Sequence, residues 1–334
     1  RGGIKLEQTT KRALEHLKVV EIGGMAAAYS SGFLAGLGAN VIKVEPPEGD
    51  PNRLLPPFAG DINDKERSIP FLNANLNKRS LVLDIADNDH KKTFKALLEN
   101  ADLLIESTPP GYLDSIGLGQ EILSQLNEGL VTVSLTHFGQ TGPYKNLSAV
   151  DAVAQAMGGT MSLNGEMDAP PMRVGVSIGD MVGGLYLALG ILAAVHSRKT
   201  TGKGQLLDIA LMEAQIALCE NAIVRHSAFN ESPSRQGSRH ALLAPFGPFE
   251  TADGYLVVAN VKDWEMFCAL IERDDVVEMA KELQPRVVAA CVPSLIPDVI
   301  VIFCVSKGIP FLLQVILAFP KLVSAAFPVT LKGL

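Results

Sequence analysis

The regular alternation of short apolar runs with helical stretches constrains the fold of this chain more than any other feature. Val19–Ile22 is an apolar run that ends at the glycine pair Gly23-Gly24. Ala26–Leu37 follows with the small residues of a packed helix, and Val41–Val44 is the next apolar run. This order is typical of a β-α-β unit with parallel strands.

The same alternation continues over the next hundred residues. Further strands are predicted at Ser80–Asp84, Leu103–Glu106 and Leu130–Leu135, and helices at Asn88–Asn100 and Gln120–Leu126. Alternating strands and helices imply a parallel sheet that is covered on both faces. We therefore predict an α/β fold, a Rossmann-like sheet with helices on both faces, over residues 1–200.

A second region is predicted over residues 201–275, as a linker followed by a smaller α/β domain. Its predicted elements are a strand at Leu206–Ala210, a helix at Met212–Ser227, a strand at Tyr255–Ala259 and a helix at Asp263–Glu272. Residues 276–334 form an atypical apolar tail with recurring prolines. Its longest apolar run, Ile309–Phe319, is about half of the roughly 20 residues that span a bilayer, so a membrane helix is disfavoured. A buried tail or an aberrant C-terminus fits the segment at least as well.

Composition excludes several classes of function. The net charge of −7 argues against a nucleic-acid surface. The four cysteines lie far apart, as in reduced proteins of the cell interior, and the six scattered histidines give a metal site little support. The polar segment Arg1–Lys18 lacks the features of a secretory signal. We expect a cytoplasmic protein, or a mitochondrial or peroxisomal one if the source is eukaryotic.

Asp180 is the residue with the strongest chemical signal, because it stands in the apolar, glycine-rich stretch Val174–Val195. An ionised carboxylate is costly in such surroundings unless something pairs with it or uses it. At the first turn of a helix it meets free backbone N–H groups, so a helix cap is one interpretation. Gly179, Gly183 and Gly184 favour another: they would clear side chains away and let a substrate approach the carboxylate.

Other polar residues give weaker signals. Gly23-Gly24 lacks the spacing of a dinucleotide-binding GxGxxG motif, which favours a simple tight turn. Lys43 and Lys78-Arg79 stand at strand edges and are either phosphate ligands or solvated side chains. His137 follows a strand, where open α/β sheets place ligands, but a single histidine there is more often structural. Tyr144 and His240 are equally ambiguous.

Seven stretches together resemble the class III coenzyme A-transferases, a family that also contains the α-methylacyl-CoA racemases. They are VVEIGGMAAAYSSGFLAGLGANVIKVEPPEGDP (Val19–Pro51), NKRSLVLDI (Asn77–Ile85), ADLLIES (Ala101–Ser107), FGQTGPY (Phe138–Tyr144), the Asp180 segment, RKTTGKGQLLDIALMEA (Arg198–Ala214) and GSRHALLAPFGPFETADGYLVVA (Gly237–Ala259). The resemblance covers about residues 17–275, with the motifs in the family's order and spacing.

This resemblance implies an activity and a set of site residues. It implies transfer of coenzyme A from an acyl-CoA to a free carboxylic acid, with Asp180 as the nucleophile that becomes an aspartyl-CoA thioester. The adenine and diphosphate of CoA would lie along the first β-α turn, around Gly24 and Met25, and near Leu83, Ser107 and Phe138. The cofactor-binding residues so implied are Gly24, Met25, Leu83, Ser107 and Phe138. CoA is then a substrate, with no tightly bound cofactor and no metal, and two subunits interlock as a homodimer.

Two alternative functions stay open at this stage. The racemase branch uses a His-Asp pair that reads Val150-Asp151 in this chain, so two-base proton exchange lacks one of its bases. The other alternative is a CoA-binding relative without catalytic activity.

Overall fold

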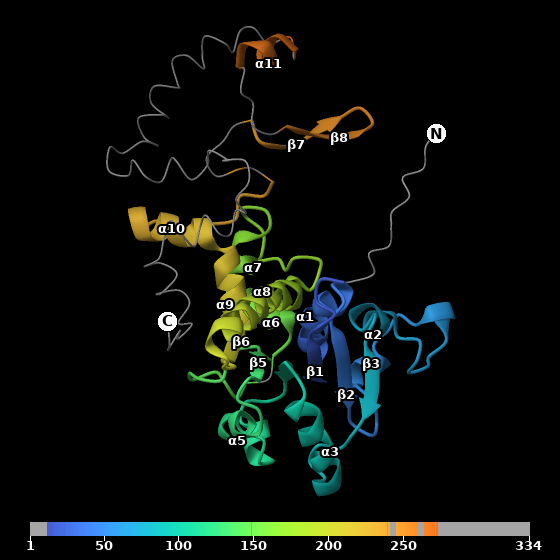
Figure 1. Cartoon of the computed structure of the whole chain (residues 1–334). Coiled ribbons are helices and arrows are strands. Elements are labelled where there is room, and N and C mark those ends of the chain that lie inside the picture. The colour runs from blue at the N-terminus through green and yellow to red at the C-terminus, as the bar shows by residue number, and fades with distance from the viewer. Residues whose placement is uncertain are drawn as a thin grey trace, which may run out of the picture. The chain divides into compact units, whose positions relative to one another are not determined.

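The structure is a computed structural model that describes residues 12–272, except 148, 239, 241–244, 259–263 and 271. Contacts divide the chain into two compact units (Figure 1), Arg1–Leu163 with Pro171–Pro233, and Asn164–Pro170 with Ser234–Leu334. The apolar tail over 276–334 lies outside the described residues.

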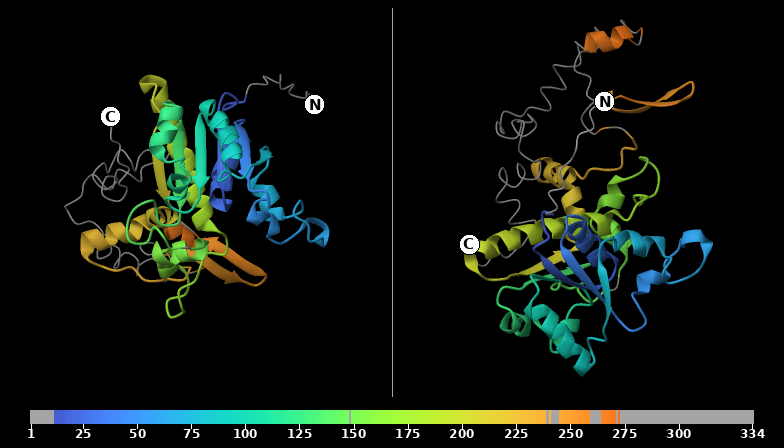
Figure 2. Two further views of the ribbon diagram at one scale, coloured as in Figure 1. Left: turned by 90° about the horizontal axis from the view of Figure 1, so that it is seen from below. Right: turned by 45° about the vertical axis from the view of Figure 1, so that its right-hand side comes forward.

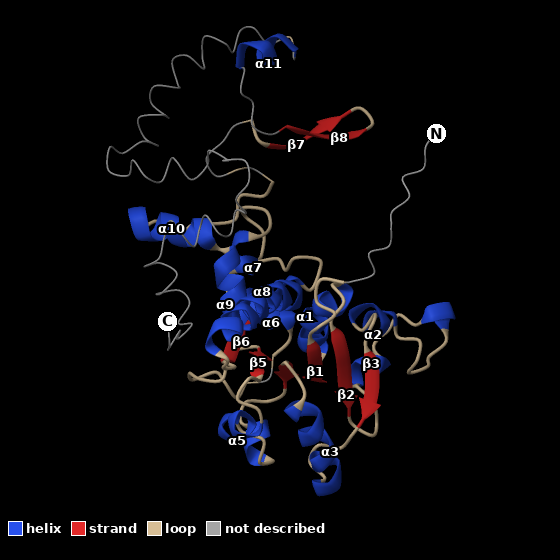
Figure 3. Ribbon diagram, viewed as in Figure 1, coloured by secondary structure: helices blue, strands red, loops and turns tan. Residues whose placement is uncertain are grey.

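The first unit contains a six-stranded sheet in the order β3-β2-β1-β4-β5-β6, in which every neighbouring pair is parallel. The strands are β1 (Lys18–Gly23), β2 (Asn40–Glu45), β3 (Arg79–Val82), β4 (Leu103–Ser107), β5 (Val131–Thr136) and β6 (Leu206–Ala210). Figure 3 shows them in red between the helices. The predicted Rossmann-like parallel sheet is confirmed. The strand order reverses between β1 and β4, which makes the carboxyl ends of these two strands the topological switch point.

Helices cover both faces of this sheet (Figure 2). The helices of this unit are α1 (Met25–Gly36), α2 (Ile69–Ala74), α3 (Asn88–Glu99), α4 (Tyr112–Ser115), α5 (Gln120–Leu126), α6 (Asp151–Met157), α7 (Thr160–Leu163), α8 (Ile178–Thr201), α9 (Leu211–Leu218) and α10 (Glu220–Phe229), with short 3₁₀ turns at Pro51–Leu54 and Ala59–Asp61. Successive strand residues point to opposite faces. Val19 therefore packs in one core with Leu34 of α1 and Leu187 of α8, while Val20 packs in the other with Phe94 of α3.

The boundary predicted at residue 200 is too early. β6 pairs with β5 in register from Thr132↔Leu206 to Thr136↔Ala210, so it is the edge strand of the large sheet. Residues 201–233 therefore belong to the first unit. The single helix predicted over Met212–Ser227 is two helices, α9 and α10, which meet at Cys219.

The described part of the second unit contains a hairpin and one short helix. β7 (Gly247–Thr251) and β8 (Gly254–Val258) pair antiparallel, and α11 spans Trp264–Leu270. The turn between the strands contains Asp253.

α8 is the one helix in the described chain that is long and apolar enough to cross a membrane by length and composition. It contacts α1, β5 and β6, and near its end Arg198 forms a 2.7 Å ion pair with Asp102. These contacts explain why α8 is so apolar: it is the core helix of an α/β unit.

Candidate active site

Asp180 lies in the first turn of α8, half-buried. Burial, and next the negative charge of Asp151, raise the pKa of Asp180 to about 6. Among the described residues, no lysine, arginine or histidine forms an ion pair with this carboxylate. Asp180 is thus a partly buried carboxylate that no cation of the described chain stabilises.

The cap of α8 is supplied by Asp151, the first residue of α6. Its Oδ1 accepts hydrogen bonds from the backbone N–H groups of Gly179, at 2.6 Å, and Asp180, at 3.2 Å. A capping carboxylate accepts from these early N–H groups. The interpretation of Asp180 as the helix cap is therefore wrong, because another carboxylate already occupies that role.

The three glycines around Asp180 serve helix packing. A Cβ on Gly179 would lie 2.6 Å from Asp151 Oδ1, and one on Gly184 would lie 3.3 Å from the backbone of α1. A Cβ on Gly183 would collide with Leu211 at the start of α9. The expectation that these glycines clear a path for substrate needs correction: α6, α9 and α1 fill the space that the missing side chains leave.

Two further titratable groups share this environment. Burial raises the pKa of Tyr29 on α1, and the charges of Asp180 and Asp151 raise it further. His137 directly follows β5; burial lowers its pKa, while the charge of Asp151 opposes that effect. Asp151 therefore acts electrostatically on Asp180, Tyr29 and His137. Tyr29 is a candidate that the sequence did not single out, and its only local signal is that it is an aromatic residue among the small residues of Ala26–Leu37.

Three of the predicted CoA residues lie at the topological switch point. Gly24 and Met25 lie at the β1–α1 turn, and the Gly24 N–H donates a 2.7 Å hydrogen bond to Ser107 Oγ at the end of β4. Gly23, in register with Ser107, has a φ of +106°, and a Cβ there would lie 2.8 Å from Ser107 N. Only glycine suits this backbone conformation and close approach.

The other two predicted CoA residues lie farther along the same edge of the sheet. Leu83 follows β3, two strands away from β1, and its N–H donates to the Glu45 carbonyl at 2.9 Å. Phe138 follows β5, and its ring centroid is 5.9 Å from that of Tyr144. Both side chains are buried. Their assignment to CoA binding stays a prediction.

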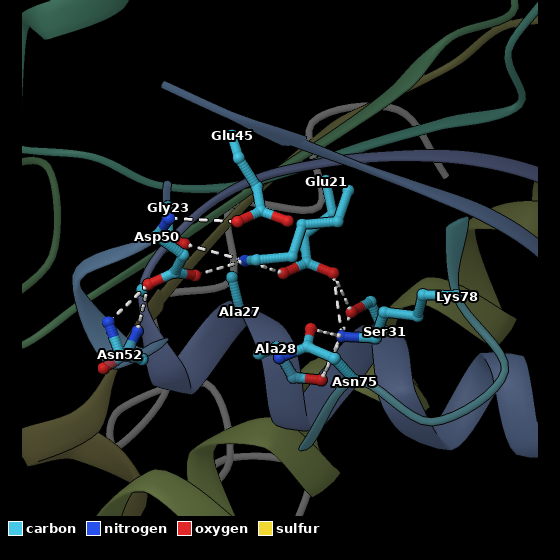
Figure 4. Close-up of polar contacts among 12 residues, drawn as sticks. Glu21, Gly23, Ala27, Ala28, Ser31, Glu45, Asp50, Asn52, Asn75 and Lys78 are labelled. Atoms are coloured by element: carbon cyan, nitrogen blue, oxygen red, sulfur yellow. Dashed lines mark hydrogen bonds and ion pairs between the residues drawn. The ribbon is translucent and has the colours of Figure 1, made fainter. Parts of the chain in front are cut away.

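Behind the β1–α1 turn lies a buried set of charges, Glu21, Lys43, Asp50 and Lys78, that we call the β1–β2 ion cluster (Figure 4). Lys43 Nζ lies 2.8 Å from Glu21 Oε1 and 2.7 Å from Asp50 Oδ2, and it donates to the Gly23 carbonyl at 3.1 Å. Lys78 Nζ lies 2.8 Å from Glu21 Oε2.

This cluster corrects the phosphate hypothesis for both lysines. Each side chain is 2% exposed, and each ammonium group donates its hydrogen bonds to oxygen atoms of the protein. Burial lowers the pKa of Lys78 to about 8 even though Glu21 opposes it. Arg79 is exposed and donates to Asn40 Oδ1 at 2.6 Å, away from the switch point.

The remaining ambiguous residues gain no chemical role from the structure. Tyr144 is 47% exposed, and its ring contacts that of Phe138. In the second unit, the His240 ring lies 4.7 Å from that of Phe246. Within the described ranges, no three histidine, cysteine, aspartate or glutamate side chains are grouped so as to hold a metal ion.

The amino-acid sequence matches the family model described as CoA-transferase family III over residues 14–290. It is 38% identical over 270 residues to the succinyl-CoA:mesaconate CoA-transferase of Haloarcula hispanica, covering 79% of this chain and 68% of that protein. It is 32% identical over 275 residues to the human succinyl-CoA:glutarate CoA-transferase, covering 81% of this chain and 62% of that protein. The chain thus spans about two thirds of the length of these relatives.

Among solved structures, the chain resembles a CAIB/BAIF family protein from Brucella suis. The TM-score is 0.72 at 35% sequence identity, and the match covers 80% of this chain and 71% of that one. The sequence, its motifs and the fold agree, and the chain belongs to CoA-transferase family III, a family of enzymes.

Proposed function

We propose that this protein transfers coenzyme A from an acyl-CoA to a free carboxylic acid, and that Asp180 is the group that carries CoA between them. The observation that supports this most is the state of Asp180: half-buried, without a cationic partner in the described chain, and with its backbone N–H already bound by Asp151. A carboxylate that no cation stabilises keeps its lone pairs available for attack on a carbonyl carbon.

The first half of the reaction moves CoA onto the protein. An Asp180 oxygen attacks the thioester carbonyl of the donor, the C–S bond breaks, and an acyl-aspartyl anhydride forms with release of CoA thiolate. The thiolate then attacks the Asp180 carbonyl carbon of this anhydride. The C–O bond breaks, the donor acid leaves as its carboxylate, and an aspartyl-CoA thioester remains.

The second half repeats these steps with the acceptor. The acceptor carboxylate attacks the aspartyl thioester, CoA thiolate leaves, and a new mixed anhydride forms. Thiolate attack on the acceptor's acyl carbon then yields the new acyl-CoA and restores the Asp180 carboxylate. No net proton is gained or lost. Two half-reactions that pass through covalent intermediates on Asp180 replace one difficult exchange.

The pKa of about 6 suits this role. Asp180 is mostly ionised at neutral pH, which nucleophilic attack requires, but the same surroundings disfavour its charge and so favour its neutral acyl and thioester forms.

We propose that CoA binds at the carboxyl edge of the sheet, where the β1–α1 turn meets the end of β4. Open α/β sheets bind ligands at this switch point. Gly24 and Ser107 meet there, and Met25, Leu83 and Phe138 lie along the same edge. In this proposal the active form is a cytoplasmic homodimer.

The substrates follow in part from the relatives. Their names pair succinyl-CoA or acetyl-CoA with acids such as mesaconate, glutarate and oxalate, all of which are dicarboxylic. We propose a short dicarboxylic acid as acceptor and a short acyl-CoA as donor.

Mass spectrometry after incubation with a panel of acyl-CoAs tests this function. We expect a CoA or acyl adduct on the peptide that contains Asp180, and its loss when the acceptor acid is added. Asp208→Asn is the matched control, because burial raises the pKa of Asp208 as well; this variant should still form the adduct on Asp180. CoA binding without any adduct would favour the non-catalytic alternative.

A further inference from the structure

Gln155 is a completely buried residue of α6 whose side-chain amide makes three hydrogen bonds. Its Nε2 donates to Asp151 Oδ2 at 2.6 Å and, more weakly, to the Val176 carbonyl at 3.4 Å. Its Oε1 accepts from the Val174 N–H at 2.9 Å. Burying an amide is unfavourable unless its polar atoms are bonded, so these three contacts hold the side chain in one orientation.

These contacts converge on the start of α8. Val174 and Val176 belong to the segment that leads into the helix, and Asp151 caps it through the N–H groups of Gly179 and Asp180. Gln155 is therefore the one side chain in the described chain that bonds both the segment before Asp180 and the carboxylate beside it.

We infer that Gln155 is a positioning residue for the transfer reaction: by fixing Asp151 and the segment entering α8, it sets the direction of the Asp180 carboxylate and keeps a negative charge beside it. Gln155 touches neither substrate nor reacting atoms in this role. The inference rests on the proposed function, because it takes Asp180 as the reacting group.

The groups that face Asp180 explain why the position of Asp151 matters. Asp151 approaches from α6 and Tyr29 from α1, while His137, after β5, lies within the electrostatic influence of Asp151. Tyr29 is neutral near pH 7, so Asp151 is the negative charge that acts on Asp180. Its Oδ2 bond to Gln155 adds to the two N–H bonds at Oδ1 that hold this charge close to Asp180.

Two substitutions of Gln155 should move the pKa of Asp180 in opposite directions. Gln155→Met removes the donor to Asp151 and lets that carboxylate turn away, so we expect the pKa of Asp180 to fall by about half a unit or more. Gln155→Glu keeps the shape but adds a carboxylate next to Asp151, so we expect the pKa of Asp180 to rise above its wild-type value. Both should lower kcat by about tenfold or more and change the KM for acyl-CoA less than about threefold.

Gln215 on α9 offers a matched control. It is equally buried, and its Oε1 accepts a 2.8 Å hydrogen bond from Thr160, but no bond links it to Asp151. Gln215→Met therefore removes a buried amide of the same size, and we expect it to lower the melting temperature without moving the pKa of Asp180.

The measurement is a carboxylate ¹³C NMR titration of Asp180 in the full-length protein, alongside kcat and KM. Opposite shifts for the two Gln155 variants, with none for Gln215→Met, are expected. An unchanged pKa in a folded Gln155→Glu protein, or the same shift in all three variants, overturns the inference. If the wild-type protein forms no adduct on Asp180, the proposed function is overturned instead. The NMR titration measures the pKa of Asp180 whether or not an adduct forms, so the two failures can be told apart.

Discussion

Two carboxylates near α1, the buried Glu21 and the half-buried Asp180, have opposite surroundings. Glu21, in the β1–β2 ion cluster, is completely buried and bound by Lys43, Lys78 and the Ser31 hydroxyl. Asp180, on α8, acts electrostatically on Tyr29 of α1, and another carboxylate, Asp151, acts electrostatically on Asp180.

Their pKa values follow from these partners. Burial acts to raise both, but the two ammonium groups hold the pKa of Glu21 below its ordinary value. For Asp180 the described part of the chain supplies no such compensation, and its pKa rises to about 6. Burial of a carboxylate therefore does not by itself mark a reactive group. Two cations make Glu21 a structural residue, whereas none of the described residues supplies a cation to Asp180, which stays available for chemistry.

The largest effect should come from removing the reactive carboxylate. Asp180→Asn keeps the shape of the side chain but cannot form the anhydride, so we expect transfer to fall by several powers of ten. The rate of acyl-CoA consumption with acceptor present measures this. A variant that keeps more than about a tenth of wild-type activity contradicts the assignment of Asp180, since that is a barrier change of less than about 1.4 kcal/mol.

Removing the structural carboxylate should instead reduce stability. Glu21→Gln leaves Lys43 and Lys78 buried without their shared anion, and we expect a loss of about 3–5 kcal/mol in the free energy of unfolding. Denaturant titration measures it. Glu66→Gln is the control, because Glu66 is 77% exposed in its pair with Arg53 and should contribute about 1 kcal/mol or less. Equal losses in the two variants would show that the ion cluster is not a structural anchor.

Asp180→Asn should also stabilise the fold at neutral pH. The pKa of Asp180 is about 6 in the folded protein against a reference of 3.8, so its ionisation costs stability as pH rises through this window. The gain should be about 1–2 kcal/mol at pH 7.5 and vanish below pH 4, allowing for partial exposure. Unfolding curves at the two pH values measure it. The same gain at both values would mean that the effect is not electrostatic.

The pH profile of transfer gives a smaller and more specific effect. Since attack requires ionised Asp180, kcat should rise tenfold per pH unit below about 6 and level off above it. Asp151→Asn removes the negative charge beside it, so we expect the midpoint to move down by about one unit. A midpoint that stays in place would assign the titration to another group.

The smallest expected effect is proton exchange at the α-carbon of a 2-methylacyl-CoA. The racemase branch needs a histidine where this chain has Val150, a 63% exposed residue directly before Asp151. We expect deuterium incorporation from heavy water at least about a hundredfold slower than CoA transfer. Rapid deuteration with inversion would favour the racemase alternative.

The sequence by itself determined the sheet, because the alternation of apolar strands with helices is a local pattern that each segment carries. It also singled out Asp180, whose charge conflicts with its apolar neighbours. It did not determine the partners of the buried charges. Lys78 lies 57 residues from Glu21 and Asp151 lies 28 residues from Gly179, so only tertiary packing decided that the lysines are structural and that Asp151 is the cap of α8.

The same reason explains the error at residue 200. An edge strand such as β6 has an alternating pattern that fits either unit, and its hydrogen bonds to β5 decided which sheet it joins. Hydrophobic periodicity records which residues of a segment are buried. Which group contacts a given side chain depends on segments that are far away in the chain. For Asp180 and Glu21, these contacts decide which carboxylate is a candidate nucleophile and which one is structural.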